Sequence, residues 1–346
     1  MQNQFKIKNL KVGYKYNPII IAEIGINHGG SLKLAKKMAS LAIKSGAHII
    51  KHQTHIISDE MSSEAKKNKI KYIGSSIYDL MASCALNEKD EFKLKKYVEK
   101  LGSVFLSTPF SRAAVDRLVK FNVPAFKIGS GECNNYPLIE YICKFKKPII
   151  LSTGMNSIKS IKKSVKIIEK NKIPYALLHT TNIYPTPYKL IRLGALETLK
   201  KNFKNAIIGL SDHSKSNLAC LGAIAMGASI VERHFTDTLT RKGPDISNSM
   251  DPKSLKELSK NSKIMKLMRG GEKNLIKEEA VVKNFAFASV VSIASIKKGE
   301  KFTKKNIWVK RPGSGDFLAK DFNKILKKKA KKNIAADKQL KKSDVY

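Results

Sequence analysis

The sequence predicts a parallel (β/α)8 barrel followed by a small β-rich module. Three observations support this. Eight short apolar runs alternate with amphipathic stretches, polar residues follow each run, and the pattern changes after about residue 270. Eight strand–helix units of this length are what such a barrel needs. An open doubly wound sheet is the alternative, but no Gly-x-Gly-x-x-Gly turn follows the first run.

The apolar runs are short and rich in β-branched residues, as expected of buried parallel strands. The predicted strands are Ile19–Ala22, Ala47–Ile50, Val104–Leu106, Ala125–Ile128, Pro148–Leu151, Ala176–Leu178, Ala206–Leu210 and Ser229–Val231. Apolar residues at helical spacing between them predict helices. The clearest helices are Leu32–Ser45, Glu88–Leu101, Ala113–Phe121, Ser157–Lys170 and Asn217–Met226.

Polar side chains follow every predicted strand. In a parallel barrel, residues at the C-terminal strand ends line the active site. A buried lysine is costly unless it meets an anion, so two lysines with several hydroxyls predict a pocket for a phosphate- and carboxylate-bearing molecule. The strand-end residues are Glu23; Lys51 and Gln53; Ser107 and Thr108; Lys127, Ser130 and Glu132; Ser152; Asn182 and Tyr184; Ser211 and His213; and Glu232 and His234.

Two of these residues, His213 and His234, are candidate metal ligands. Imidazoles from neighbouring strand ends can bind one divalent ion and leave its other positions open for substrate. The alternative is a pair of core histidines whose hydrogen bonds are satisfied. We favour the metal site because the other strand ends also carry polar groups.

The formal net charge of +38 suggests a nucleic-acid partner. However, the lysines are spread over the whole chain, and the sequence has no nucleic-acid-binding motif, so we expect mostly solvated surface and no nucleic-acid partner. No apolar run is long enough to span a membrane, and no signal peptide is recognisable. The four cysteines have no paired spacing, which suggests reduced thiols in a cytoplasmic protein.

The chain divides into a barrel over residues 1–270, a linker over 271–284 and a β-rich module over 285–346. Within the module, Ile296, Phe302 and Ile307 are spaced like Ile334, Leu340 and Val345, which predicts two related halves. Between the second strand and the next helix, residues 55–87 form either a cover over the barrel mouth or a surface insertion.

Several long motifs resemble those of the bacterial sialic acid synthases. In the barrel these are Ala22–His28, Lys51–Thr54, Ser107–Phe110, Lys127–Asn135, Thr181–Pro187, Leu210–His213, Glu232–Asp237 and Gly243–Asp245. In the module, Phe285–Ser289 and Val309–Gly313 resemble the antifreeze-like (SAF, β-clip) domain of these enzymes. The resemblance is collinear from about residue 5 to the end of the chain.

The resemblance implies a reaction in which phosphoenolpyruvate condenses with N-acetylmannosamine and water, giving N-acetylneuraminate and phosphate. It implies that His213 and His234 bind Mn²⁺ (or Mg²⁺ or Co²⁺), and that Glu23 handles a proton. Lys51, Thr108, Lys127, Ser130, Ser152, Asn182 and Ser211 would bind phosphoenolpyruvate. Gln53, Glu132, Tyr184, Asp245 and Phe285 would face the sugar. Arg311 would reach it from the partner subunit of a domain-swapped homodimer.

The chain departs from the family pattern at Ile70–Ser75, where the related enzymes have a Pro-Gly-Asn turn, and slightly at Ile246–Met250. Because the first of these segments lies near the expected sugar site, a 2,4-diacetamido-2,4,6-trideoxyhexose is the alternative acceptor. The product would then be legionaminic or pseudaminic acid. A third hypothesis is a catalytically silent sugar- or ice-binding protein, which would have no need of the histidines and pocket lysines.

Overall fold

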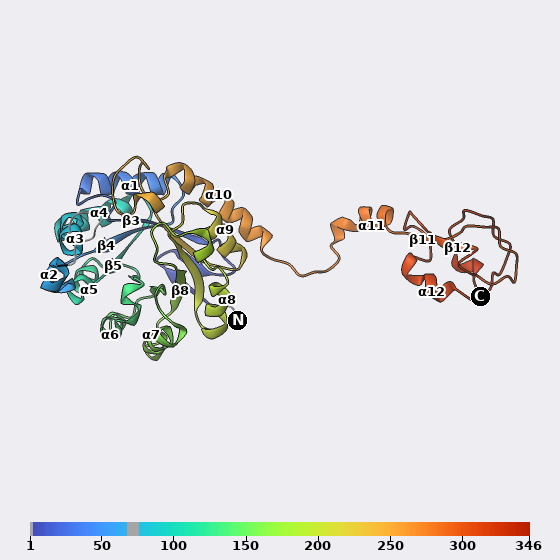
Figure 1. The fold of residues 1–346 in the computed structure, drawn as a ribbon, viewed down its shortest axis with the longest axis horizontal. Helices are drawn as coiled ribbons and strands as arrows, with labels where there is room; N and C mark the ends of the chain where they lie inside the picture. Colours follow the sequence, from blue (N-terminus) through green and yellow to red (C-terminus); the bar gives the residue numbers. More distant parts are fainter. Residues whose placement is uncertain (1–2, 68–75) are drawn as a thin grey trace. The chain divides into compact units, whose positions relative to one another are not determined.

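The computed structural model describes residues 3–67 and 76–346 of the chain (Figure 1). Two compact units are present, Met1–Gly270 and Gly271–Tyr346. Each has its own apolar core. Among the described residues, no helix has the length and apolar character that crossing a membrane requires.

The first unit is a nearly closed parallel barrel, as predicted. Its strands are neighbours in chain order, β10 pairs with β3, and β5 contacts β6. All eight predicted strands are present, and all except β6 run further at their C-terminal ends than predicted. The strands are β3 (Ile19–Gly25), β4 (Ile49–Thr54), β5 (Val104–Pro109), β6 (Phe126–Ile128), β7 (Ile149–Ser152), β8 (Tyr175–Thr180), β9 (Ile207–Asp212) and β10 (Ile230–His234).

Helices surround the strands (Figure 1). Several begin where predicted because a polar side chain caps the first turn; Ser31, Asn87 and Ser157 each accept a hydrogen bond from a backbone N–H. The helices are α1 (Leu32–Lys44), α4 (Glu88–Lys100), α5 (Arg112–Lys120), α6 (Tyr136–Cys143), α7 (Ile158–Lys170), α8 (Ala195–Asn202), α9 (Leu218–Ala225) and α10 (Pro252–Met268). Short 3-10 turns occupy Gly131–Asn134, Tyr188–Leu190 and Ile246–Asn248.

Alternation along each strand decides which side chains enter the barrel. Ile19 and Ile21 pack inside it, and Glu23 follows them on the same face at the C-terminal end. The N-terminal hairpin of β1 (Gln4–Ile7) and β2 (Leu10–Gly13) was not predicted. Its Ile7 and Val12 belong to the interior cluster, so the hairpin closes the other end of the barrel.

The segment between β4 and α4 consists largely of short helices: α2 (Ile57–Glu60), a 3-10 turn (Ser63–Lys66) and α3 (Ile77–Cys84). Asp59 Oδ2 accepts a hydrogen bond of 2.8 Å from the backbone N–H of Ala113, in the first turn of α5, the helix that follows β5. That bond places α2 at the C-terminal end of the barrel. The departure from the family pattern at Ile70–Ser75 lies outside the described residues.

The second unit contains α11 (Ala280–Ala286), β11 (Ser289–Ser292), β12 (Ile307–Lys310), α12 (Phe322–Ile325) and 3-10 turns at Lys277–Glu279, Ala319–Asp321 and Lys342–Asp344. The packing of this unit agrees with its predicted internal repeat. Ile296 and Ile334 exchange two backbone hydrogen bonds of 2.8 Å, and all six repeat residues are buried in one core. Phe285, the first residue of the predicted β-rich module, lies in α11, and the first strand of the module begins at Ser289.

Candidate active site

A cavity of about 150 Å³ opens at the C-terminal end of the barrel, and every strand contributes a side chain to its wall. It unites twelve of the predicted site residues: Glu23, Lys51, Gln53, Thr108, Lys127, Ser130, Ser152, Asn182, Tyr184, Ser211, His213 and His234. Because the strands run further than predicted, His234 and most of the others are the last inward-facing residues of strands rather than loop residues. His213 follows β9 by one residue.

Four buried charged groups form the floor of this cavity. Lys51 pairs with Glu23 and lies 3.7 Å from Glu232, and Lys127 lies 3.4 Å from the same Glu232 oxygen. All four side chains are almost fully buried. Two cations and two anions therefore balance inside the barrel, which is how buried charges are tolerated.

Burial and these neighbours shift the ionisation of the four groups. Burial raises the pKa of Glu23 to about 7, although Lys51 opposes the shift. Burial also lowers the pKa of Lys127 to about 8, against the attraction of Glu232. Burial acts to raise the pKa of Glu232, but Lys127 and Lys51 outweigh it and hold that pKa at about 2. Glu232 is thus the fixed anion between two lysines.

Hydroxyl and amide groups complete this wall. Lys51 Nζ donates to Thr108 Oγ1 at 3.1 Å, and Lys127 Nζ donates to Ser152 Oγ at 2.8 Å. The Asn182 Oδ1 atom is buried and has no hydrogen-bond partner among the described residues. This oxygen lies so close to Gly154 that a Cβ at position 154 would be only 1.8 Å from it. The position therefore requires glycine. The wall is built to meet a polar ligand.

The two predicted metal ligands lie together, with ring centroids 5.5 Å apart. His213 Nδ1 donates to the Thr181 carbonyl oxygen at 2.9 Å, which leaves Nε2 without a proton. Burial lowers the pKa of His213 to about 4 and that of His234 to about 3, so both rings are neutral near pH 7. His234 Nδ1 is buried and has no hydrogen-bond partner in the described part of the chain. Neutral imidazoles with free nitrogens suit a divalent ion.

Further metal ligands would have to come from substrate or water. Across residues 3–67 and 76–346, no group of three or more His, Cys, Asp or Glu side chains has an arrangement that could bind a metal. The Asp245 carboxylate lies close to the two histidines, with its Oδ2 atom 3.7 Å from His234 Nδ1. Burial raises the pKa of Asp245 to about 6. Tyr184 stacks on His213 with centroids 4.1 Å apart.

Four predicted site residues do not line the cavity. Glu132 lies in the turn after β6, where it accepts a hydrogen bond from Asn135 at 2.5 Å. Asp245 is not part of the cavity wall, although its carboxylate lies 3.7 Å from His234 Nδ1. Phe285 and Arg311 belong to the second unit, and both are exposed. The roles of Phe285 and Arg311 remain predictions.

Ser107 was placed among the pocket residues, and this prediction is wrong. It faces the helices, where it shares a hydrogen bond of 2.7 Å with Thr54. Alternation along β5 sends Thr108 inward and Ser107 outward. Ser107 joins a buried network around Glu91 of α4, which also contacts His52 at 3.1 Å and Arg117 at 3.2 Å.

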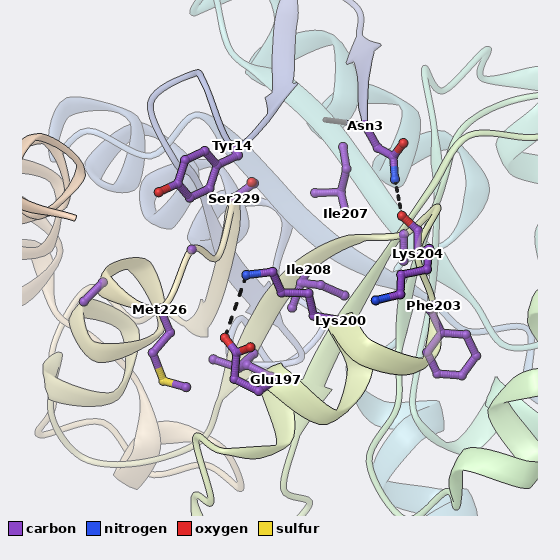
Figure 2. A pocket seen from close by; sticks show the side chains of 14 residues that line it. Asn3, Tyr14, Glu197, Lys200, Phe203, Lys204, Ile207, Ile208, Met226 and Ser229 are labelled. Atoms are coloured by element: carbon purple, nitrogen blue, oxygen red, sulfur yellow. Dashed lines mark hydrogen bonds and ion pairs between the residues drawn. The ribbon is translucent and has the colours of Figure 1, made fainter. Parts of the chain in front are cut away.

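A second cavity, of about 500 Å³, opens at the opposite end of the strands (Figure 2). Ile207, which begins β9, and Ser229, which precedes β10, help to line it. Glu197 and Lys200 on its wall pair with each other at 4.0 Å. Catalytic residues of parallel barrels lie at the C-terminal strand ends. We therefore place the candidate site in the smaller cavity.

Comparison with known proteins identifies the family of this chain. The NeuB family model matches residues 38–274, and the SAF domain model matches residues 287–345. The chain belongs to the NeuB family. The resemblance found in the sequence is thereby confirmed, together with the C-terminal SAF domain.

Named members of the family are similar over almost the whole chain. An N,N'-diacetyllegionaminic acid synthase of Campylobacter jejuni is 37% identical over 92% of this chain and 97% of its own length. A pseudaminic acid synthase of the same species is 33% identical over 94% and 96%. The crystal structure of a sialic acid synthetase of Leptospira borgpetersenii in complex with citrate has a TM-score of 0.75. It is 31% identical and covers 82% of this chain and 95% of that one.

Proposed function

We propose that this NeuB-family enzyme condenses phosphoenolpyruvate with an N-acetylated amino-sugar aldehyde and water, giving a nine-carbon keto-acid sugar and phosphate. One observation carries the proposal. All eight strands direct side chains into one cavity, where two buried lysines lie beside two neutral histidines. Anion binding and carbonyl activation are the two capacities that this reaction needs.

Phosphoenolpyruvate would occupy the lysine side of the cavity. Lys51 and Lys127 would meet its carboxylate and phosphate, with Thr108, Ser130, Ser152, Asn182 and Ser211 as hydrogen-bonding partners. The protein's own charges already balance there, so this ligand brings net negative charge. A bound divalent cation would offset part of that charge.

His213 and His234 would hold the divalent ion, which we expect to be Mn²⁺ (or Mg²⁺ or Co²⁺). Their neutral rings and free nitrogens fit this role. A divalent ion bound there supplies Lewis-acid polarisation of the sugar's aldehyde oxygen. The protein's contribution is to fix the imidazole orientation, as Thr181 does for His213.

The proposed reaction forms one carbon–carbon bond and breaks the bond between C2 and the bridging phosphate oxygen. C3 of phosphoenolpyruvate attacks the aldehyde carbon, which leaves positive charge at C2. Water adds to C2, and the carboxylate form of Glu23 takes a proton from it and passes that proton to the former aldehyde oxygen, which becomes a hydroxyl. The bond between C2 and the bridging phosphate oxygen then breaks, and phosphate leaves with that oxygen. The new hydroxyl on C2 becomes the ketone, and its proton goes to the departing phosphate. Lys51 and Lys127 stabilise the departing phosphate from fixed positions.

The acceptor sugar would contact Gln53, Glu132, Tyr184, Asp245 and Phe285. Arg311 would donate to its N-acetyl carbonyl from the partner subunit of a domain-swapped homodimer. A site built to hydrogen-bond that carbonyl rejects sugars without it. The exposed positions of Phe285 and Arg311 leave both side chains available for such a contact.

Two acceptors compete. The sequence motifs favoured N-acetylmannosamine. The relative at 37% identity is named a legionaminic acid synthase, which favours a 2,4-diacetamido-2,4,6-trideoxyhexose at least as strongly. The two sugars share the aldehyde and the 2-acetamido group, so the roles of the lysines and histidines are the same for both.

Phosphate release from phosphoenolpyruvate with Mn²⁺ tests the function and the acceptor together. The assay compares N-acetylmannosamine, its 6-phosphate and 2,4-diacetamido-2,4,6-trideoxymannose. Release that requires N-acetylmannosamine makes the enzyme an N-acetylneuraminate synthase, and preference for the diacetamido sugar makes it a legionaminic acid synthase. Release with none of the three contradicts the proposed reaction.

A further inference from the structure

A buried histidine that the proposed reaction does not use lies beside the sugar side of the cavity. His55 follows β4, and only 5% of its surface is exposed. Its ring stacks on Phe110 with centroids 4.6 Å apart and an angle of 8° between the planes. Phe110 lines the cavity, so the ring lies directly behind the cavity wall.

Both ring nitrogens of His55 have polar partners. Nδ1 lies 2.8 Å from Glu60 Oε2 in α2, and Nε2 lies 3.1 Å from Gln53 Oε1. A carboxylate oxygen and an amide oxygen can only accept hydrogen bonds. In this arrangement each nitrogen therefore carries a proton, and the Glu60 carboxylate supplies the counter-charge.

His55 binds the oxygen end of the Gln53 amide, which leaves the nitrogen end to meet a ligand. Gln53 and Glu23 both line the cavity. Nε2 of Gln53 lies 3.4 Å from the point that a Cβ on Gly25 would occupy, and Glu23 Oε1 lies 2.9 Å from that point, so both groups lie next to Gly25. The NH₂ group is therefore the end of the Gln53 amide that can donate to a ligand in the cavity.

We propose that His55, held by Glu60, is a positioning residue that fixes the Gln53 amide with its NH₂ group directed at the acceptor sugar. The proposal rests on the function proposed above and adds to it the polarity of one sugar contact. Gln53 would donate to a sugar hydroxyl or acetamido oxygen. Without the ion pair, the amide can turn and present its oxygen, which repels a ligand oxygen.

The isosteric variant Glu60→Gln tests the proposal, because it removes the charge and keeps the side-chain shape. We expect KM for the acceptor sugar to rise about tenfold, the worth of one lost hydrogen bond, with KM for phosphoenolpyruvate unchanged. The matched control is Glu64→Gln. Glu64 is exposed in the same segment and pairs with Lys67 at 2.9 Å. This control should change neither constant.

Two substitutions of His55 separate positioning from packing. His55→Leu keeps apolar contact with Phe110 but removes the donor, so it should show the same selective loss. His55→Gln restores a donor toward Gln53 and should recover part of the sugar affinity. An equal rise of both KM values in Glu60→Gln, or no rise in sugar KM, would overturn the proposal.

A readout that does not depend on turnover distinguishes this inference from the proposed function. If the wild-type enzyme releases no phosphate with any sugar, the function fails, while ¹⁵N NMR of the His55 ring still tests the geometry. The His55 signals are assigned by their loss in His55→Gln. Protons on both nitrogens in the wild type, and on one in Glu60→Gln, support the inference. A singly protonated ring in the wild type overturns it.

Discussion

Glu232 is a counter-ion shared by both pocket lysines, although it was not among the predicted catalytic or binding residues. Its carboxylate lies within 3.7 Å of Lys51 and 3.4 Å of Lys127, and Ser211 donates to it at 3.2 Å. Its place directly after the last predicted strand, Ser229–Val231, could be read from the sequence. Its role could not, because a role as counter-ion depends on which strands become neighbours across the barrel.

The first prediction concerns pH. Glu23 must be a carboxylate to accept a proton, so activity should rise as pH increases through its raised pKa of about 7. Lys127 must be charged to bind an anion, so activity should fall above its lowered pKa of about 8. We expect a narrow bell-shaped profile of kcat/KM for phosphoenolpyruvate. If residual kcat/KM of the Glu23→Gln variant still rose with pH through about 7, that rise could not be assigned to Glu23.

The second prediction concerns the histidines. His213→Ala and His234→Ala should each abolish metal-dependent turnover and weaken Mn²⁺ binding by at least about tenfold, measured by equilibrium dialysis of the purified protein. His179→Gln is the control, because His179 faces away from the cavity and bonds to the Ile191 carbonyl. Full activity after metal chelation would contradict the proposed role of a bound metal in turnover.

At the scale of elements, the alternation of side chains along each strand explains which cavity residues could be predicted from the sequence. It identified the strands and most of the cavity residues because inward polar residues stand out against β-branched runs. It failed for Ser107, because two adjacent polar residues, Ser107 and Thr108, do not reveal which one faces inward. The buried carboxylate of Glu91 was not predicted, although its spacing with Leu94 and Val98 is that of one face of α4.

The third prediction concerns the packing of β9. A Cβ on Gly209 would lie 2.5 Å from both the Ile230 carbonyl oxygen and Leu178 Cδ2. Gly209→Ala should therefore lower the free energy of unfolding by about 1–3 kcal/mol. Gly194→Ala, where a Cβ would meet nothing within 4 Å, is the matched control. Equal denaturant midpoints for the two variants would contradict this prediction, because they would mean that a methyl group fits at position 209 without cost.

At the scale of the whole molecule, the barrel and the SAF domain are two compact units with separate cores. The sequence revealed the repeat in the second unit because its six apolar positions form two sets of three with the same spacing. It did not reveal the N-terminal hairpin, which consists of two strands of four residues each. Short two-stranded elements carry too few residues to show a pattern.

The fourth prediction concerns the contribution of the second unit. Arg311→Ala should raise KM for the acceptor sugar by about tenfold or more and leave KM for phosphoenolpyruvate nearly unchanged. Lys305→Ala in the same unit is the control. A barrel truncated after residue 280 should bind phosphoenolpyruvate but turn over poorly. Normal kinetics of that fragment would exclude a contribution of the SAF domain in trans.

The central claim is that this cavity joins phosphoenolpyruvate to an amino sugar and releases phosphate by breaking the C2–O bond. The most direct test supplies phosphoenolpyruvate labelled with ¹⁸O at the bridging oxygen, together with acceptor sugar and Mn²⁺, and follows the label by ³¹P NMR. We expect the label to leave with phosphate. Retention of the label in the sugar product, from P–O cleavage, or sugar-independent release, would contradict it.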